Sequence, residues 1–279
     1  MPADVDGAGS PSQKPRALIV TVYGLYARES GGWMSVASII RLLAQCDVDE
    51  PAVRSAIFRL KRRGLLEAEK VDGIAGYGLS DDARAILDEG DRRIFERRRA
   101  APNEGWLLAV FSVPETERDQ RHQLRSRLTW LGFGTVAAGV WIAPAHLLDE
   151  TRHTLQRHGL DVYVELFRGE RLGFTDSSPA VASWWDLDRL AGLYDEFLAR
   201  YAPVAARYRR RRRVDPPRAF GDYVDALTQW RRLPYSDPGL PVRVLPAGWR
   251  GFDAERTFLE LHERLAGPAH EFAAAVSAE

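Results

Sequence analysis

A strongly basic amphipathic helix is expected between residues 50 and 64, and this helix constrains the chain more than any other segment. The sequence there is EPAVRSAIFRLKRRG. Its apolar residues follow the i, i+3, i+4, i+7 spacing of one helix face: Val53, Ala56, Ile57 and Leu60. At about 100° per residue, the opposite side carries Arg54, Ser55, Phe58, Arg59 and Arg62, with Lys61 and Arg63 at its margins. Such a helix can pack on a core through one face and present positive charge to a polyanion through the other.

The segment before the basic helix predicts a second, shorter helix. Ser35 is a good N-cap because its hydroxyl can accept a bond from a free N–H of the first turn. The same apolar spacing then recurs at Val36, Ile39, Ile40 and Leu43. A polar link over residues 47–49 separates the two helices, and Asp49 can cap the basic one. Pro51 falls in its first turn, where a missing N–H costs little.

The segment after the basic helix predicts a β-hairpin. Asp72-Gly73 lies between the β-like runs 65–71 and 77–79, and Asp-Gly is a common two-residue hairpin turn. Helix, turn, basic helix and hairpin follow each other in the order of a winged helix-turn-helix, whose second helix enters the major groove. An ordinary helix with a solvated basic face is the alternative. For Phe58 we expect packing beneath the hairpin, with contact to a thymine methyl as the other interpretation.

Composition places the chain among globular proteins with a local rather than a global positive charge. Apolar residues make up 45% of its 279 residues, and 39 basic residues balance 39 acidic ones. A nucleic-acid-binding protein without net charge must concentrate its cations, which favours a dedicated DNA-reading module. The single cysteine, Cys46, excludes an intrachain disulfide and a multi-cysteine zinc site. We interpret Cys46 as a core thiol rather than a redox switch.

The ends and the hydropathy of the sequence predict a cytoplasmic protein. Residues 1–15, MPADVDGAGSPSQKP, are rich in Pro, Gly, Ser and Asp and lack the apolar centre of a signal peptide. We expect a disordered tail there. No apolar run reaches the 18 residues that a membrane span requires, so no membrane partner is expected.

Two domains precede the C-terminal region in this interpretation. The DNA-binding domain spans residues 16–100. Its last helix begins near Ser80 and ends in Glu96-Arg97-Arg98-Arg99, whose three arginines suit the negative end of the helix dipole. A second domain over 104–172 shows the pattern βαββαβ of a ferredoxin-like fold. Its expected strands are 106–113, 135–136, 140–142 and 162–167, and its expected helices are 115–131 and 146–158.

The third domain, residues 180–279, is predicted to be mainly helical and regulatory. One long helix is expected from Trp184 to Tyr208, followed by the arginine run 209–213. Further helices are expected at 220–233 and from Thr257 onward, with a Pro- and Gly-rich loop over 237–251. The overall fold class is therefore α+β: a winged helix-turn-helix, a ferredoxin-like domain and a helical C-terminal domain.

The sequence resembles the PaaX family, the phenylacetic-acid degradation repressors, over nearly its whole length. Four segments carry the resemblance: VRSAIFRLKRRGLL (53–66), FSVPETERDQRHQLRSRLTWLGFGTVAAGVWIAP (111–144), FLARYAPV (197–204) and SDPGLPVRVLPAGWRG (236–251). The last segment is fairly specific, because its prolines and Trp249 have an irregular spacing that periodicity does not explain.

The resemblance implies a homodimeric repressor of aromatic catabolism genes that an aryl-CoA thioester, typically phenylacetyl-CoA, releases from double-stranded operator DNA. Carried over by position, the residues that read DNA are Arg54, Ser55, Arg59 and Arg62. Lys61, on the same helix, and Lys70, in the predicted hairpin, are counted with them as DNA contacts. A regulator that senses a different acyl-CoA or an aromatic acid is the first alternative.

The second alternative is a nucleic-acid hydrolase, because the middle domain also resembles the small CRISPR-associated ferredoxin-like nucleases. Those enzymes hold a metal with an Asp at the end of the first strand. Here the strand ends Phe111-Ser112-Val113-Pro114, and the first carboxylate is Glu115. We therefore expect a dimerisation platform, with no catalytic residue, no metal and no cofactor. No Walker, Rossmann, HExxH or GxSxG element stands in the sequence.

Two clusters in the C-terminal half have open interpretations. The arginine run 209–213 is a solvated helix end, a site for the phosphates of a CoA-like ligand, or a non-specific DNA contact. Trp184-Trp185 and Trp230 are expected in the core or at an interface. Trp230, Arg231 and Arg232 nevertheless combine a stacking surface with cations and form the candidate ligand site.

Overall fold

The computed structural model describes residues 14–173 and 177–278. Most of the predicted disordered tail, residues 1–13, lies outside the described residues, and Lys14 and Pro15 already belong to the first helix. The chain divides into two compact units, each assembled from segments that are distant in sequence. Among the described residues, unit 1 contains 14–95, Asp195–Arg232 and 252–278, whereas unit 2 contains residues between Glu96 and Tyr194 and Leu233–Gly251. The predicted domain boundaries stay a prediction.

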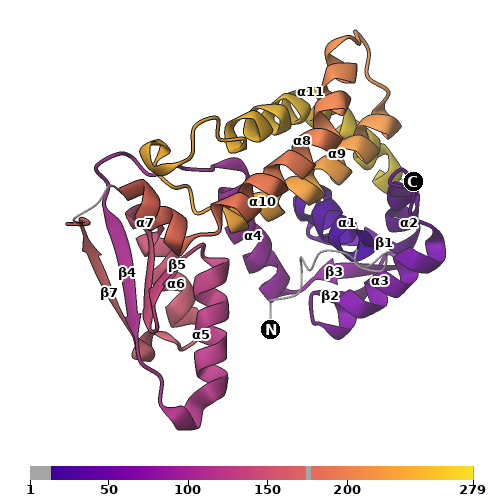
Figure 1. The fold of residues 1–279 in the computed structure, drawn as a ribbon. Coiled ribbons are helices and arrows are strands. Elements are labelled where there is room, and N and C mark those ends of the chain that lie inside the picture. The colour runs from indigo at the N-terminus through magenta and orange to yellow at the C-terminus, as the bar shows by residue number, and fades with distance from the viewer. Residues whose placement is uncertain (1–13, 174–176, 279) are drawn as a thin grey trace. The chain divides into compact units, whose positions relative to one another are not determined.

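Unit 1 combines a small antiparallel sheet of strand order β1-β3-β2 with helices from both ends of the chain (Figure 1). Its elements are α1 (Lys14–Val22), a π-helical turn (Tyr23–Ala27), β1 (Trp33–Ser35), α2 (Val36–Ala44), α3 (Glu50–Arg62), β2 (Leu66–Val71), β3 (Ile74–Leu79), α4 (Asp81–Phe95), most of α8 (Leu187–Arg209), α9 (Pro216–Trp230) and α11 (Gly251–Ala278).

Local signals in the sequence set the boundaries of the N-terminal elements as predicted. The Ser35 hydroxyl accepts a hydrogen bond of 2.9 Å from the N–H of Ser38 and caps α2. The Asp49 carboxylate accepts one of 2.9 Å from the N–H of Ala52 and caps α3. Asp72 and Gly73 both have positive φ, 52° and 81°, as a tight two-residue hairpin turn requires.

Other boundaries differ from the prediction. The expected long helix 184–208 corresponds to α8, which begins three residues later at Leu187, where the Asp186 carboxylate accepts a hydrogen bond of 2.9 Å from the N–H of Arg189. The separate helix α7 (Ser177–Trp184) before it was not predicted. Strand β1 was not predicted, because three residues are too few to show a periodicity. It is defined by its pairing with β3, in which Trp33 lies opposite Gly78.

The C-terminal helices of unit 1 share a core with the N-terminal ones. Helix α1 packs against both α3 and α9. The buried hydroxyls of Thr21 on α1 and Thr228 on α9 form a hydrogen bond of 2.8 Å. The Arg41 guanidinium on α2 donates a bond of 2.7 Å to the carbonyl of Val276, near the end of α11. Helices α9 and α11 are therefore part of the support of α2 and α3.

Unit 2 contains a four-stranded antiparallel sheet of strand order β5-β6-β4-β7. Its elements are β4 (Trp106–Phe111), α5 (Arg118–Trp130), β5 (Gly134–Ala137), β6 (Val140–Pro144), α6 (Leu148–Arg157), β7 (Val164–Gly169), α7, the first residues of α8 and α10 (Arg232–Ser236). The elements from β4 to β7 follow the predicted order βαββαβ.

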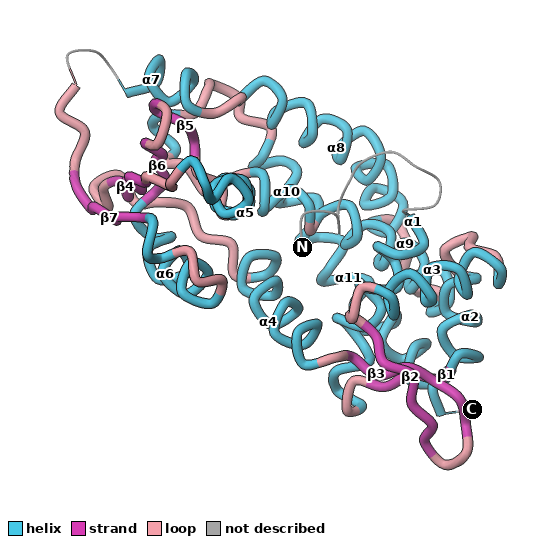
Figure 2. The backbone as a smooth tube through the Cα atoms, turned by 90° about the horizontal axis from the view of Figure 1, so that it is seen from below, coloured by secondary structure: helices cyan, strands magenta, loops and turns pink. Residues whose placement is uncertain are grey.

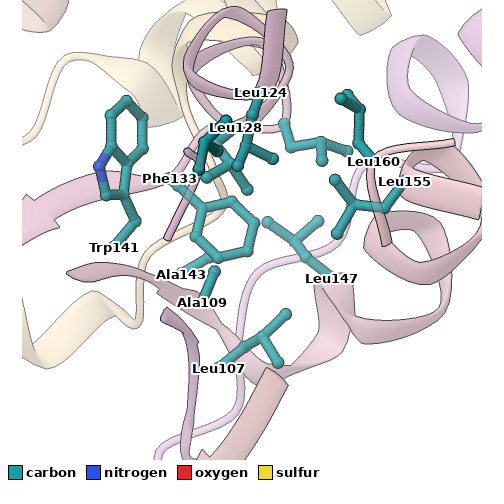
Figure 3. Close-up of a cluster of buried hydrophobic side chains, with 12 residues drawn as sticks. Leu107, Ala109, Leu124, Leu128, Phe133, Trp141, Ala143, Leu147, Leu155 and Leu160 are labelled. Atoms are coloured by element: carbon teal, nitrogen blue, oxygen red, sulfur yellow. The ribbon is translucent and has the colours of Figure 1, made fainter. Parts of the chain in front are cut away.

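One face of this sheet forms a closed apolar core with α5 and α6 (Figure 3). Leu107 and Ala109 of β4 and Trp141 of β6 meet Leu124 of α5 and Leu155 of α6 there. On the opposite face, Trp106 packs against Trp184 and Trp185, with ring centroids about 6 Å apart. The indole N–H of Trp185 donates a hydrogen bond of 2.9 Å to the carbonyl of Gly132, so this tryptophan is part of the core.

The segment that follows α4 is held in unit 2 by a buried cluster of ion pairs and hydrogen bonds around Asp237. Arg97 and Arg99 were expected to extend the helix, but α4 ends at Phe95 and both guanidiniums bind the buried carboxylate of Asp237 instead. The hydroxyl of Tyr194 donates a further bond of 2.7 Å to this carboxylate. Burial alone would raise the pKa of Asp237, but the two arginines and the Tyr194 hydroxyl outweigh it and lower the pKa to about 2.

We predict that Asp237→Asn destabilises the protein by about 3–5 kcal/mol at neutral pH, because it leaves two buried guanidiniums without their carboxylate. The folded pKa lies below the ordinary value of 3.8, so this stability is present above about pH 4 and is lost as the pH falls toward 2. Urea denaturation of wild type and variant between pH 2 and 7 measures the difference. Exposed Asp161→Asn is the control, and a difference that does not change with pH would contradict the ionic role of Asp237.

Candidate nucleic-acid interface

Helix α3 has the two faces that the sequence predicted. Val53, Ala56, Ile57 and Leu60 are buried in the core of unit 1, where α3 packs against α1 and α2. The remaining face is open to solvent: Arg54, Ser55, Phe58, Lys61, Arg62 and Arg63 are exposed, and Arg59 is half-buried. The structure therefore brings all five candidate helix residues to the surface of one element.

The β2–β3 hairpin lies next to this helix, since β2 contacts α3 and the tip extends beyond the helices of unit 1 (Figure 2). Lys70 is exposed near the tip, beside the exposed apolar residues Val71 and Ile74. The base of the hairpin is acidic, because Glu67 and Glu69 are also exposed. Within the hairpin, the tip thus combines a cation with apolar surface.

Short-range contacts orient the arginines of α3 without burying them. The Arg54 guanidinium donates a bond of 2.7 Å to the Glu50 carboxylate one turn earlier. The Arg59 guanidinium donates one of 2.8 Å to the hydroxyl of Ser55. Exposed pairs at this spacing contribute only a few tenths of a kcal/mol, so a phosphate or a base edge can replace them. The face therefore remains available to a polyanion.

Phe58 does not pack beneath the hairpin, so that prediction is wrong. Its side chain is 59% exposed, among the cations of α3. The guanidinium carbon of Arg62 lies 6.0 Å from the ring centroid, within the range of a cation–π interaction. The hairpin is held by its own pairing and by Ser80, whose hydroxyl donates to the carbonyl of Gly64 over 2.7 Å.

The candidate ligand residues lie at the C-terminal end of α9. Trp230 is 1% exposed, and its ring stacks on Phe258 at 4.7 Å between centroids. The Arg231 guanidinium donates to the carbonyl of Ala17 on α1 over 3.4 Å, and that of Arg232 donates to the side chain of Gln229 over 3.2 Å. Trp230 is thus a core residue of unit 1, and the ligand role of the three residues stays a prediction.

The arginine run lies at the end of α8 and in its connection to α9. Arg209 pairs with Glu260 at 2.7 Å, whereas Arg210–Arg213 are exposed. Figure 1 shows this connection at the end of unit 1 opposite the β2–β3 hairpin, so the run does not enlarge the basic face of α3.

The remaining chemistry of the described residues is limited. Cys46 is buried, and burial raises the pKa of its thiol to about 12, which confirms a core thiol. Within residues 14–173 and 177–278, no three His, Cys, Asp or Glu side chains gather closely enough to hold a metal ion. None of the helices described there combines the length and the apolar character needed to cross a membrane.

Three family models of PaaX proteins match successive parts of the chain. The model for the PaaX-like protein matches residues 14–83, the one for the PaaX central Cas2-like domain matches 99–181, and the one for the PaaX-like C-terminal domain matches 185–275. The first match contains α3 and the β2–β3 hairpin, and the second contains the four-stranded sheet of unit 2.

Two individual proteins are similar to the chain over most of its length. It is 25% identical to the transcriptional repressor PaaX of Escherichia coli strain K12 over 260 residues, which cover 92% of this chain and 82% of that protein. Among solved structures, the uncharacterized protein Rv0674 from Mycobacterium tuberculosis matches with a TM-score of 0.59 and 21% identity. That match covers 93% of this chain and 98% of the other, and it shows a shared fold.

Proposed function

The chain belongs to the PaaX family, and from this premise we propose that it is a repressor of phenylacetate-type aromatic catabolism genes that reads operator DNA through α3. Family membership makes the chain a regulator of transcription and not an enzyme. The family therefore gives no support to the hydrolase alternative for the middle domain.

One observation carries the DNA-binding proposal: several basic side chains lie on the solvent face of α3, and no other described element of the fold covers them. We interpret α2, α3 and the β2–β3 hairpin as a winged helix-turn-helix, with α3 in the major groove and the hairpin at the backbone. Arg54, Arg59 and Arg62 have forked guanidiniums suited to base edges and phosphates. Lys61 and Lys70 suit phosphates, which position the protein without reading sequence.

We further propose that an aryl-CoA thioester such as phenylacetyl-CoA releases the repressor, with another acyl-CoA or an aromatic acid as the alternative effector. The family supports this proposal, and the packing of unit 1 supplies a route for it. Because α1 contacts both α9 and α3, a ligand that shifts the C-terminal helices also shifts the support of the DNA-reading helix. Trp230, Arg231 and Arg232 lie at the end of α9 where such a shift would be transmitted.

We propose that unit 2 is a ferredoxin-like dimerisation domain. The sheet face opposite the α5–α6 core contains Leu108 and Val110 on β4, with Phe167 paired opposite Leu108 on the edge strand β7. Phe167 is 55% exposed and Val110 is 38% exposed, so this face has apolar surface that a second copy can cover. A symmetric dimer places two copies of α3 on an inverted repeat.

The DNA-binding proposal predicts that Arg54→Ala/Arg59→Ala weakens binding to a duplex selected by the wild-type chain from a randomised library. Each lost base contact should cost about 1–3 kcal/mol, and the variant should discriminate less between selected and scrambled duplexes. Fluorescence anisotropy at several salt concentrations provides the measurement. Arg210→Ala/Arg211→Ala removes the same charge outside α3 and is the matched control. Equal affinities of wild type and the α3 variant would contradict the proposal.

The dimer proposal predicts a mass of twice 31.4 kDa for the wild type in light scattering at micromolar concentration. Phe167→Glu places a charge in the proposed interface and should give the monomer mass, whereas Val162→Glu, at a residue that is 76% exposed, should not. The selected duplex should contain half-sites separated by about one helical turn or a multiple of it. A monomeric wild type, or a Phe167 variant as dimeric as the control, would refute this interface.

The effector proposal predicts that phenylacetyl-CoA lowers the affinity for the selected duplex and that phenylacetate does not. A shift of the DNA-competent population from 99:1 to 1:99 requires about 10⁴-fold preference of the effector for the other state. By linkage, duplex must weaken effector binding by the same factor, which calorimetry with and without duplex can measure. If phenylacetate lowers the affinity for the duplex and phenylacetyl-CoA does not, the thioester proposal is wrong and an aromatic acid is the effector.

A further inference from the structure

We propose that Phe58 is a specificity-determining residue that contacts the 5-methyl group of a thymine in the major groove of the operator. The proposal rests on the proposed function and concerns which base α3 selects. It assigns a recognition role to an aromatic residue that lies within an otherwise polar and cationic face.

The exposed ring of Phe58 indicates a binding partner, because apolar surface in contact with water is unfavourable. It is the most exposed phenylalanine in the part of the chain that the structure describes, at 59%. Its neighbours on the same face, Ser55 and Arg62, lie one turn before and one turn after it. An apolar ring in this position gains free energy only when another apolar group covers it.

The major groove offers one apolar group, and it belongs to thymine. Each base pair presents a pattern of donors and acceptors, and only thymine adds a methyl group at C5. The cations around Phe58 attract the phosphates that flank the groove, which places the ring at the base edges rather than at the backbone. The cations of α3 thus complement the phosphates of the duplex, and the Phe58 ring complements the thymine methyl group.

Arg62 indicates which base lies next to this thymine. Its guanidinium carbon is 6.0 Å from the Phe58 ring centroid, so the two side chains leave the helix together. Four residues of α-helix rise about 6 Å, compared with about 3.4 Å per base step. Because an arginine fork pairs with O6 and N7 of guanine, we infer a guanine within one or two base pairs of the thymine.

The experiment removes only the methyl group. Duplexes are selected from a randomised library by the full chain, and each thymine of a half-site is then replaced in turn by 2′-deoxyuridine. For the wild type, one replacement per half-site should weaken binding about fourfold, the equivalent of one buried methyl group. Cytosine at that position should bind more weakly still, and 5-methylcytosine should recover part of the loss, since it carries the same methyl.

Three variants assign the effect to Phe58. Phe58→Ala should bind the thymine and deoxyuridine duplexes equally, whereas Phe58→Leu should keep most of the discrimination because it retains an apolar contact. Leu259→Ala removes an exposed apolar side chain from α11 and should behave as wild type. Circular dichroism spectra of the variants check that all are folded.

Two outcomes overturn the inference. If no thymine-to-deoxyuridine replacement changes wild-type affinity, α3 does not read a methyl group. If Phe58→Ala keeps the same discrimination as the wild type, another residue reads it, and the exposed ring serves a different partner. Either result leaves duplex selection intact, whereas failure to select any duplex would instead count against the proposed function.

Discussion

Helix α1 is the element on which the proposed DNA-reading surface depends, because it packs against both α3 and α9. Leu18, Ile19 and Val22 are fully buried in this position. A displacement of one helix is passed to the helices packed against it, because a close-packed core does not deform continuously. The hydrogen bond between the buried hydroxyls of Thr21 and Thr228 also links α1 directly to α9, in addition to the bonds that these hydroxyls make to carbonyls of their own helices. The orientation of α3 is therefore tied to helices from the far end of the chain.

The arginines of this protein fall into two groups, those buried in ion pairs and those exposed to solvent, and the two groups have different roles. Arg97 and Arg99 surround the buried Asp237 carboxylate, where breaking the cluster is expensive. The arginines of α3 are exposed and make exchangeable contacts along their own helix. A chain with as many acidic as basic residues can in this way keep one face basic while its other cations stabilise the fold.

The sequence predicted those parts of the fold that local chemistry determines. The N-caps Ser35 and Asp49, the Asp72-Gly73 turn and the apolar face of α3 all depend on residues within one or two turns of each other. The candidate residues of α3 were found for the same reason. The binding of Arg97 to Asp237 and the pairing of β1 with β3 involve residues far apart in sequence, which periodicity cannot detect. The exposure of Phe58 was missed because apolarity alone suggested burial.

Tethered cleavage of DNA would test most directly whether α3 is the element that enters the major groove. Cys46 is buried with its thiol pKa raised to about 12, so a cysteine introduced by Glu50→Cys at the start of α3 can be labelled selectively with an iron chelate. Hydroxyl radicals released there should cut the selected duplex within each half-site, at its major groove. The same label at Glu263→Cys on α11 should leave the half-sites intact. Uniform cleavage from Glu50→Cys, or half-site cleavage from Glu263→Cys, would contradict the assignment of α3 as the DNA-reading helix.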